Sequence, residues 1–300
     1  VMETPTPVSA LLHAGIINGG TFLIVRLADV VLLSPAALTA LIIVGASTAV
    51  IASVVLTTQS SVKVALGWSS AAHMGFMLML CGLGAFPVAI LHLVAHSFYK
   101  AHAFLSSGSA VEAPAMPSAS HGAAPTWPQI TAGFLAAAFG VWAVGTALGA
   151  DVTEKPVTLG LSLIIAIALT QLWASGLAAG RASRASSAFA LIGRTALAAG
   201  LTTLAFFGLE LTAAALLSTA VPVVSLESPT TLALLGLVIV TFAAVVILQL
   251  RLPAYASTPA FRALRVHARN GFYANDLFDR WVGAWHVDTR PSTASSRSIR

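Results

Sequence analysis

Three imidazoles and an ammonium group lie within one apolar stretch, residues 91–105, which reads LHLVAHSFYKAHAFL. His92, His96 and Lys100 follow one another at intervals of four residues. On an α-helix each such step advances about 6 Å and rotates about 40°, so the three groups form a slowly winding file, and His102 lies off it. Ionisable groups at membrane depth cost about 2.5–3.5 kcal/mol each on insertion scales, so their presence favours a pathway that uses them. The pattern predicts a proton relay.

A relay needs groups that gain and lose protons near ambient pH. Histidine does so unperturbed, with a pKa of about 6.5, whereas lysine does so only where burial and nearby positive charge change its pKa substantially. We expect His13 and His73 to lie on neighbouring helices and to extend the file across about half of the membrane. The stretches around these residues contain no buried acid, so a carboxylate would have to come from elsewhere.

Other interpretations of these residues were weighed. A single buried histidine more often only hydrogen-bonds two helices together, but three ionisable groups on one stripe favour the relay. Zinc is disfavoured, because the Glu of an HExxH motif is absent and no Cys or Asp lies nearby. We therefore expect no metal ligands, no cofactor and no catalytic residues. Lys63, at the start of an apolar run, either joins the path or extends its ammonium group to the membrane surface.

The composition excludes a soluble protein. Of the 300 residues 57% are hydrophobic and only 8% are charged, and the mean hydropathy is +0.90. These values predict an all-α, polytopic transmembrane helix bundle. The net charge is +5. The positive-inside rule explains this charge better than nucleic-acid binding does, because the arginines cluster in loops and the tail. Cys81 is the only cysteine, so no internal disulfide is possible.

The apolar runs predict eight spans, separated by short polar segments. These are residues 8–25, 36–56, 62–83, 87–108, 130–148, 157–179, 188–221 and 231–250. Arg194 and Glu210 share the seventh run; sixteen residues make about 24 Å of helix, so we expect them near opposite ends without pairing. The first residues have no basic segment typical of a signal peptide, and we expect the sequence to begin within a longer gene product.

Four regions follow from this reading. Residues 1–110 carry four spans with the polar motifs, residues 111–126 form a loop rich in Pro, Ala, Ser and Gly, and residues 127–252 carry about four further spans. Residues 253–300 form an amphipathic segment, with a turn at Asn270 and Gly271 between two surface helices, and a disordered tail.

The charges of the loops predict the orientation. One side holds most of the basic residues, among them Lys63, Arg181, Arg184, Arg194, Arg251 and those of the tail. The basic side should be cytoplasmic, so both ends of the chain are expected there, in a bacterial inner membrane. His121, His267 and His286 fall in loops or the tail and receive no role.

Three stretches carry a resemblance to a known family. They are ETPTPVSALLHAGIINGGTFLIVRL at residues 3–27, SSVKVALGWSSAAHMGFMLM at 60–79 and LHLVAHSFYKAHAFLSSGS at 91–109. Together they resemble the proton-translocating, antiporter-like membrane subunits of respiratory complex I and the Mrp antiporters. The versions HAGIINGG and YKAHAFLSSGS look like the branch that serves inorganic carbon accumulation. The resemblance covers about the first 110 residues, and NGFYANDLFDR near the end is similar to the family's C-terminal segment.

The resemblance implies that His13, His92, His96 and Lys100 occupy proton-path positions and that Lys63 matches a family lysine near a helix start. His73 and His102 are possible further members. It also implies two inverted repeats of five helices, each with a helix broken at mid-membrane. This chain would supply the second repeat and the C-terminal helices. The lysine expected in its broken helix has no counterpart between Trp127 and Gly149, where no Lys occurs.

The function implied by the resemblance is that of a transporter subunit and not an enzyme. It would conduct protons to energise the accumulation of carbon dioxide or bicarbonate, with a partner that is a zinc protein similar to beta carbonic anhydrases. Two alternatives stay open within the family, a subunit of an NADH:quinone oxidoreductase and an Mrp-type cation/proton antiporter. A third, of another class, is a structural membrane scaffold.

Overall fold

The computed structural model describes residues 3–108, 124–150, 155–182, 185–217, 220–222 and 228–283. Every regular element within these residues is a helix, which confirms the predicted all-α class. Most of the predicted loop 111–126, the tail beyond 283, Arg184, His121 and His286 lie outside the described residues.

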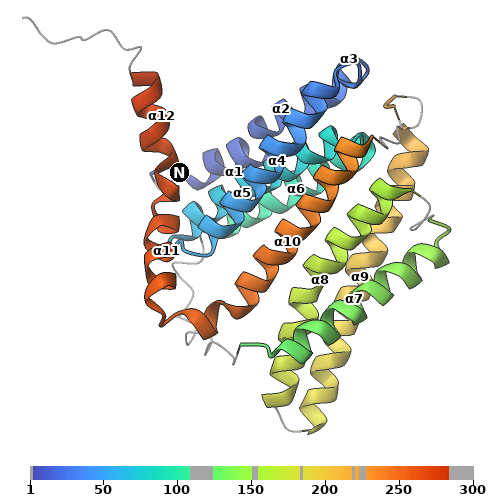
Figure 1. The fold of residues 1–300 in the computed structure, drawn as a ribbon, viewed down its shortest axis with the longest axis vertical. Coiled ribbons are helices and arrows are strands. Elements are labelled where there is room, and N and C mark those ends of the chain that lie inside the picture. The colour runs from blue at the N-terminus through green and yellow to red at the C-terminus, as the bar shows by residue number, and fades with distance from the viewer. Residues whose placement is uncertain are drawn as a thin grey trace, which may run out of the picture.

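The described helices run through the chain in the following order (Figure 1). They are α1 (Thr6–Ala14), η1 (Ile16–Asn18), α2 (Gly19–Arg26), α3 (Ala28–Leu32), α4 (Pro35–Leu56), α5 (Val62–Gly82), α6 (Phe86–Ser106), α7 (Trp127–Ala147), α8 (Pro156–Ala182), α9 (Ala185–Leu217), α10 (Pro229–Tyr255), α11 (Pro259–Arg269), η3 (Gly271–Tyr273) and α12 (Ala274–Gly283).

Seven helical segments within the described residues are long and apolar enough to cross a membrane. They match seven of the eight predicted spans. The remaining one is α6, which is as long as α5 and α7 but carries three histidines and a lysine that lower its mean hydropathy. The chain is a multi-pass membrane protein, and its most polar long helix is the one that bears the file of basic groups.

The first span is broken, where one continuous helix was predicted. α1 ends at Ala14, a 3₁₀ turn follows over Ile16–Asn18, and α2 continues the span. The side chain of Asn18 donates a hydrogen bond to the carbonyl of Ala14, at 2.8 Å, and another to the hydroxyl of Ser97 on α6, also at 2.8 Å. Asn18 thus satisfies a backbone group left free by the break and ties the break to α6.

The break implied between Trp127 and Gly149 is not found. α7 runs without interruption over Trp127–Ala147, and Thr126 and Gln129 cap its start. Glycines at 133, 140 and 145 remain helical, and no proline follows Pro128 within the helix, so the residues that would open a helix are missing. The expectation of a broken helix here is wrong.

α4 and α5 pack with their backbones in contact. A Cβ atom added at Gly45 would lie 2.5 Å from the backbone N of Met79 and 2.6 Å from the carbonyl of Gly75. One added at Gly82 would lie 2.7 Å from the side chain of Ile42. Small residues allow this close approach. In a membrane the hydrophobic effect does not drive helices together, so van der Waals contact between closely packed helices helps to hold them.

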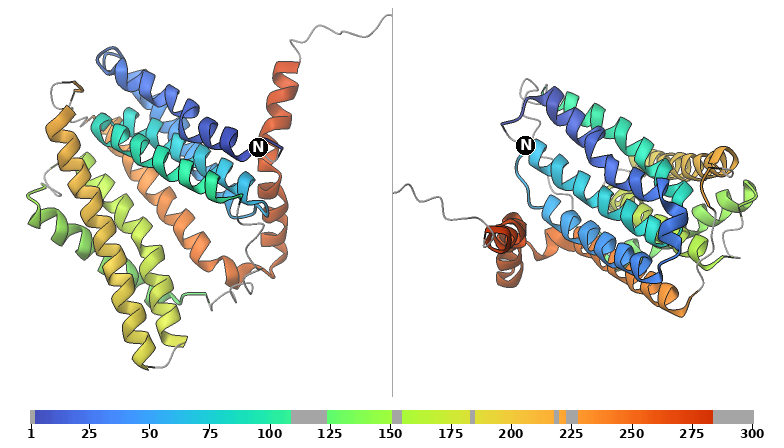
Figure 2. Two further views of the ribbon diagram at one scale, coloured as in Figure 1. Left: turned by 180° about the vertical axis from the view of Figure 1, so that it is seen from behind. Right: turned by 90° about the horizontal axis from the view of Figure 1, so that it is seen from above.

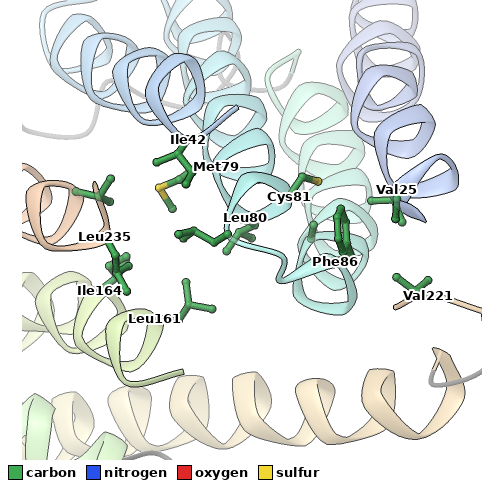
Figure 3. Close-up of a cluster of buried hydrophobic side chains, with 14 residues drawn as sticks. Val25, Ile42, Met79, Leu80, Cys81, Phe86, Leu161, Ile164, Val221 and Leu235 are labelled. Carbon is green, nitrogen blue, oxygen red and sulfur yellow. The ribbon is translucent and has the colours of Figure 1, made fainter. Parts of the chain in front are cut away.

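The remaining helices form a second group against the first. α7, α8 and α9 pack together, and α10 lies between them and α4 (Figures 1 and 2). A cluster of buried apolar side chains joins the two groups, with Met79, Leu80 and Phe86 from the first and Leu161 and Leu235 from the second (Figure 3). Arg251 near the end of α10 donates a hydrogen bond to the carbonyl of Pro125 just before α7, at 2.9 Å.

The C-terminal helices lie at one end of the bundle. Gln59, in the connection between α4 and α5, donates to the carbonyl of Arg269 at 3.3 Å, and Gly271 lies against the ring of Trp68. The described N-terminal residues lie at the same end (Figures 1 and 2). Two helices joined by a turn at Asn270 and Gly271 therefore match the predicted pattern.

The packing of α4 on α5 generates a prediction. Gly45→Val should destabilise the folded protein by at least about 1–3 kcal/mol, because the added atoms meet backbone that cannot move aside. The measurement is thermal unfolding of the detergent-solubilised protein. Gly140→Val on α7 is the matched control, since nothing lies within 4 Å of a Cβ added there. Equal unfolding temperatures for the two variants would contradict the packing.

Candidate functional site

The predicted file occupies the inner face of α6. Pro87 in the first turn of α6 suits a helix start, and from there His92, His96 and Lys100 recur at helical spacing. His96 is 3% exposed and Lys100 is fully buried at 0%, while His92 is half-buried. The ammonium of Lys100 donates a hydrogen bond to the backbone carbonyl of Leu66 on α5, at 3.1 Å.

His73 on α5 joins the file directly. Its Nδ1 lies 2.8 Å from Nε2 of His92, so one ring donates to the other, and the two ring centroids are 5.0 Å apart. The centroid of His73 is also 5.2 Å from that of His96. His73 was only a possible member on sequence grounds, yet it contacts two members of the file at once.

His13 on α1 adds the fourth imidazole. Its ring stacks on Phe104 of α6, one turn after Lys100, with centroids 4.6 Å apart. α1 packs along α6, which brings the two helices together at this point. We call the resulting set of His13, His73, His92, His96 and Lys100 the basic row.

Two of the sequence candidates lie outside the basic row. Lys63 at the start of α5 donates a hydrogen bond to the carbonyl of Thr4, at 2.9 Å, and thereby holds the segment before α1. His102 is exposed near the end of α6 and faces away from the file. The structure brings neither of them into contact with the basic row.

A cavity adjoins each end of the basic row. The His13 cavity, of about 540 Å³, is lined by Glu3, Thr4, His13 and residues of α5 that include Gly67 and Trp68. The His92 cavity, of about 420 Å³, has His73 and His92 in its wall. Its other lining residues are mostly apolar and come from α4, α5, α6, α8, α9 and α10.

Several buried nitrogens of the row have no partner within the described residues. Both ring nitrogens of His96 and Nδ1 of His13 are in this state. Buried polar atoms are normally satisfied by protein or by water, and unpartnered imidazole nitrogens are suited to passing protons through water. Within the described part of the chain, no group of three His, Cys, Asp or Glu side chains could hold a metal ion.

Sequence reasoning missed three parts of this site. Glu3 belongs to the ETPTP motif but was assigned no role, and it supplies an acid at the His13 cavity. The Leu66 carbonyl and the bond from Asn18 to Ser97 were not foreseen. The acid in the motif was a usable signal for Glu3, whereas a backbone carbonyl leaves no trace in the residue types.

Comparisons with known proteins show which proteins this chain is similar to. Residues 1–126 match the family "NADH:quinone oxidoreductase/Mrp antiporter, TM". The chain is similar to the probable inorganic carbon transporter subunit DabB of Hydrogenovibrio crunogenus, with 57% identity over 112 residues, 37% of this chain and 22% of that protein. It is 35% identical over 283 residues to DabB2 of Halothiobacillus neapolitanus, which covers 94% of this chain and 49% of that protein.

A more distant similarity connects the chain with respiratory complex I. NADH-ubiquinone oxidoreductase chain 5 of Metridium senile is 40% identical over 113 residues, 37% of this chain and 19% of that protein. The chain thus spans about half the length, or less, of the curated relatives it matches.

The burial of the basic row generates a prediction. Diethyl pyrocarbonate, which modifies accessible imidazoles, should react much faster with His102 than with His96, because His102 is exposed and His96 is 3% exposed. Peptide mass spectrometry of the solubilised protein at successive times measures both rates. Equal rates in folded protein would contradict the placement of His96, and denatured protein, in which both rings react, is the control.

Proposed function

We propose that this chain is a proton-conducting membrane subunit of a transport complex, because residues 1–126 match the NADH:quinone oxidoreductase/Mrp antiporter membrane family. The observation that carries the proposal is the basic row. Four imidazoles and one ammonium group from α1, α5 and α6 gather inside a membrane bundle; His73 contacts both His92 and His96, and one cavity adjoins His13 while another adjoins His73 and His92. Packing alone does not require so many ionisable groups in one place.

The geometry supports transfer in short steps. A proton arriving through the His13 cavity reaches His13, then Lys100 and His96, then His73 and His92. In the hydrogen bond between His73 and His92 a proton can move from one ring to the other without a change of rotamer. Two positive charges this close repel each other, so protonation of one group favours release from its neighbour.

The available energy is adequate for work by such a path. One charge crossing a potential of 100 mV is worth about 2.3 kcal/mol. In this proposal residues 1–110 carry the path, and α11 and α12 lie at the membrane surface. Residues of α8, α9 and α10 form one wall of the His92 cavity. We place the chain in a bacterial inner membrane, with its basic side and both ends cytoplasmic.

The similarity to DabB subunits supports inorganic carbon as the cargo of the complex. The partner in this proposal is a DabA-like zinc protein, which would hydrate carbon dioxide to bicarbonate, while this chain supplies the proton-driven energy. In this proposal the zinc chemistry belongs to the partner.

The second candidate function is that of a subunit of an NADH:quinone oxidoreductase. It is favoured by the 40% identity to NADH-ubiquinone oxidoreductase chain 5 of Metridium senile. The identity to DabB over a stretch of similar length is higher, at 57%. Purification of the full-length gene product from its own membrane discriminates the two. A zinc-containing partner supports the first candidate, and redox subunits with flavin or iron–sulfur centres support the second.

The basic row generates a prediction on transport. Lys100→Ala should lower proton flux by at least about tenfold, because it removes the ammonium group at the centre of the path. Fluorescence quenching of a pH-sensitive dye in proteoliposomes, with the full-length protein and any co-purified partner, measures the flux. His102→Ala, on the exposed face of the same helix, should leave flux unchanged. Undiminished flux in folded Lys100→Ala would leave only the scaffold interpretation.

A further inference from the structure

The basic row ends at His92, in the wall of an apolar cavity. Among the described residues that line the His92 cavity, His73 and His92 are the only ionisable ones. The far wall consists of apolar side chains of α8, α9 and α10, such as Ile164, Phe206 and Phe242. A proton that reaches His92 therefore needs an acceptor beyond these lining residues.

Glu210 on α9 lies next to residues that line this cavity. It directly follows Leu209 and lies one turn after Phe206, and both of these residues line the His92 cavity. The buried residues of α9 follow a stripe at helical spacing, which contains Ala199, Thr203, Phe207 and Ala213, and of these Ala199 and Phe207 pack against α7 and α8 beside the cavity. Glu210 falls on this stripe, two turns after Thr203, and is half-buried.

Glu210 and His92 also lie at similar depth in the bundle. Phe86 at the start of α6 and Val221 after the end of α9 belong to one buried cluster (Figure 3), against which Leu217 also packs. His92 lies six residues, or about 9 Å, into α6 from Phe86. Glu210 lies seven residues, or about 10 Å, back along α9 from Leu217. The chain runs away from this cluster along α6 and toward it along α9, so six residues forward on α6 and seven residues back on α9 reach a similar level.

No structural role accounts for the carboxyl group. Within the described residues Glu210 has no hydrogen-bond or ion-pair partner, and its side chain is half-buried. Arg194, the other charge on α9, is exposed and lies about 24 Å away along the helix, as the sequence predicted. A carboxyl group on the inner face of a membrane-spanning helix is costly, and such groups mark ion pathways.

We propose that Glu210 accepts the proton from His92 across the His92 cavity, an inference that rests on the proposed function. In this step the N–H bond of the His92 imidazolium breaks and an O–H bond forms on Glu210, which leaves a neutral imidazole and a carboxylic acid. The cavity has space for about a dozen water molecules at roughly 30 Å³ each, enough for a connecting chain. Glu210 then releases the proton and returns to the carboxylate.

The test uses Glu210→Gln, which keeps the size of the side chain and removes its titration. Proton flux of the full-length protein in proteoliposomes should fall by at least about tenfold, and Glu210→Asp should restore part of it. Asp276→Asn on α12 is the matched control, since it makes the same change outside the path. Normal flux in Glu210→Gln together with lost flux in Lys100→Ala overturns this inference and leaves the proposed function intact.

A second variant tests the route. Ala168→Phe on α8 adds a ring at the wall of the His92 cavity from an exposed position and should also lower flux. Normal flux in this variant overturns transfer across the cavity. Normal flux in Glu210→Gln, Ala168→Phe and Lys100→Ala alike would instead overturn the proposed function.

A measurement on the unmodified protein covers the case in which a variant does not fold. Infrared difference spectra taken while a pH gradient drives flux should contain a carboxyl C=O band that rises and decays with transport. Labelling of glutamate with ¹³C should shift that band. Its absence in protein that conducts protons overturns the role of Glu210.

Discussion

The hydrogen bond from the Lys100 ammonium to the Leu66 carbonyl is the constraint on which the site depends. The side chain is fully buried, and a charge in an apolar interior is tolerable only with a partner. The carbonyl of Leu66 also accepts a hydrogen bond from the Ser70 hydroxyl, at 3.0 Å. A single backbone oxygen of α5 therefore holds the most buried ionisable group of α6, and it fixes the position of the two helices relative to each other.

The two faces of α5 make that position possible. Gly75 and Gly82 are seven residues apart and face α4, where they admit its backbone. His73 is two residues before Gly75, about 200° around the helix, so it points away from α4 and toward His92. Close packing on one side of α5 thus sets how far the imidazole on the other side reaches. The Asn18 bond to Ser97 holds α6 from its opposite flank in the same way.

The sequence predicts features that depend on one helix, and it leaves open those that depend on how two helices pack. The spacing of His92, His96 and Lys100 fixes their common face, because it depends only on the geometry of one helix. The contact of His73 with His92 depends on the rotation of α5 against α6, and no local pattern encodes that rotation. Seven of the spans were predictable from apolar length alone.

The location of the helix break was not predictable in the same way. The first span carries Gly15, Asn18, Gly19 and Gly20. The helix breaks here, and the side-chain amide of Asn18 donates a hydrogen bond to the backbone carbonyl of Ala14. In α7 no asparagine accompanies the glycines, and the helix continues without a break.

The two cavities differ in the residues that line them. The one at Glu3 and His13 has polar residues, whereas the one at His92 is walled mostly by apolar side chains. Under the proposed function, an apolar cavity beside a titratable pair resists proton leakage while the pair is neutral, so the residues of the proposed path also limit when a proton passes.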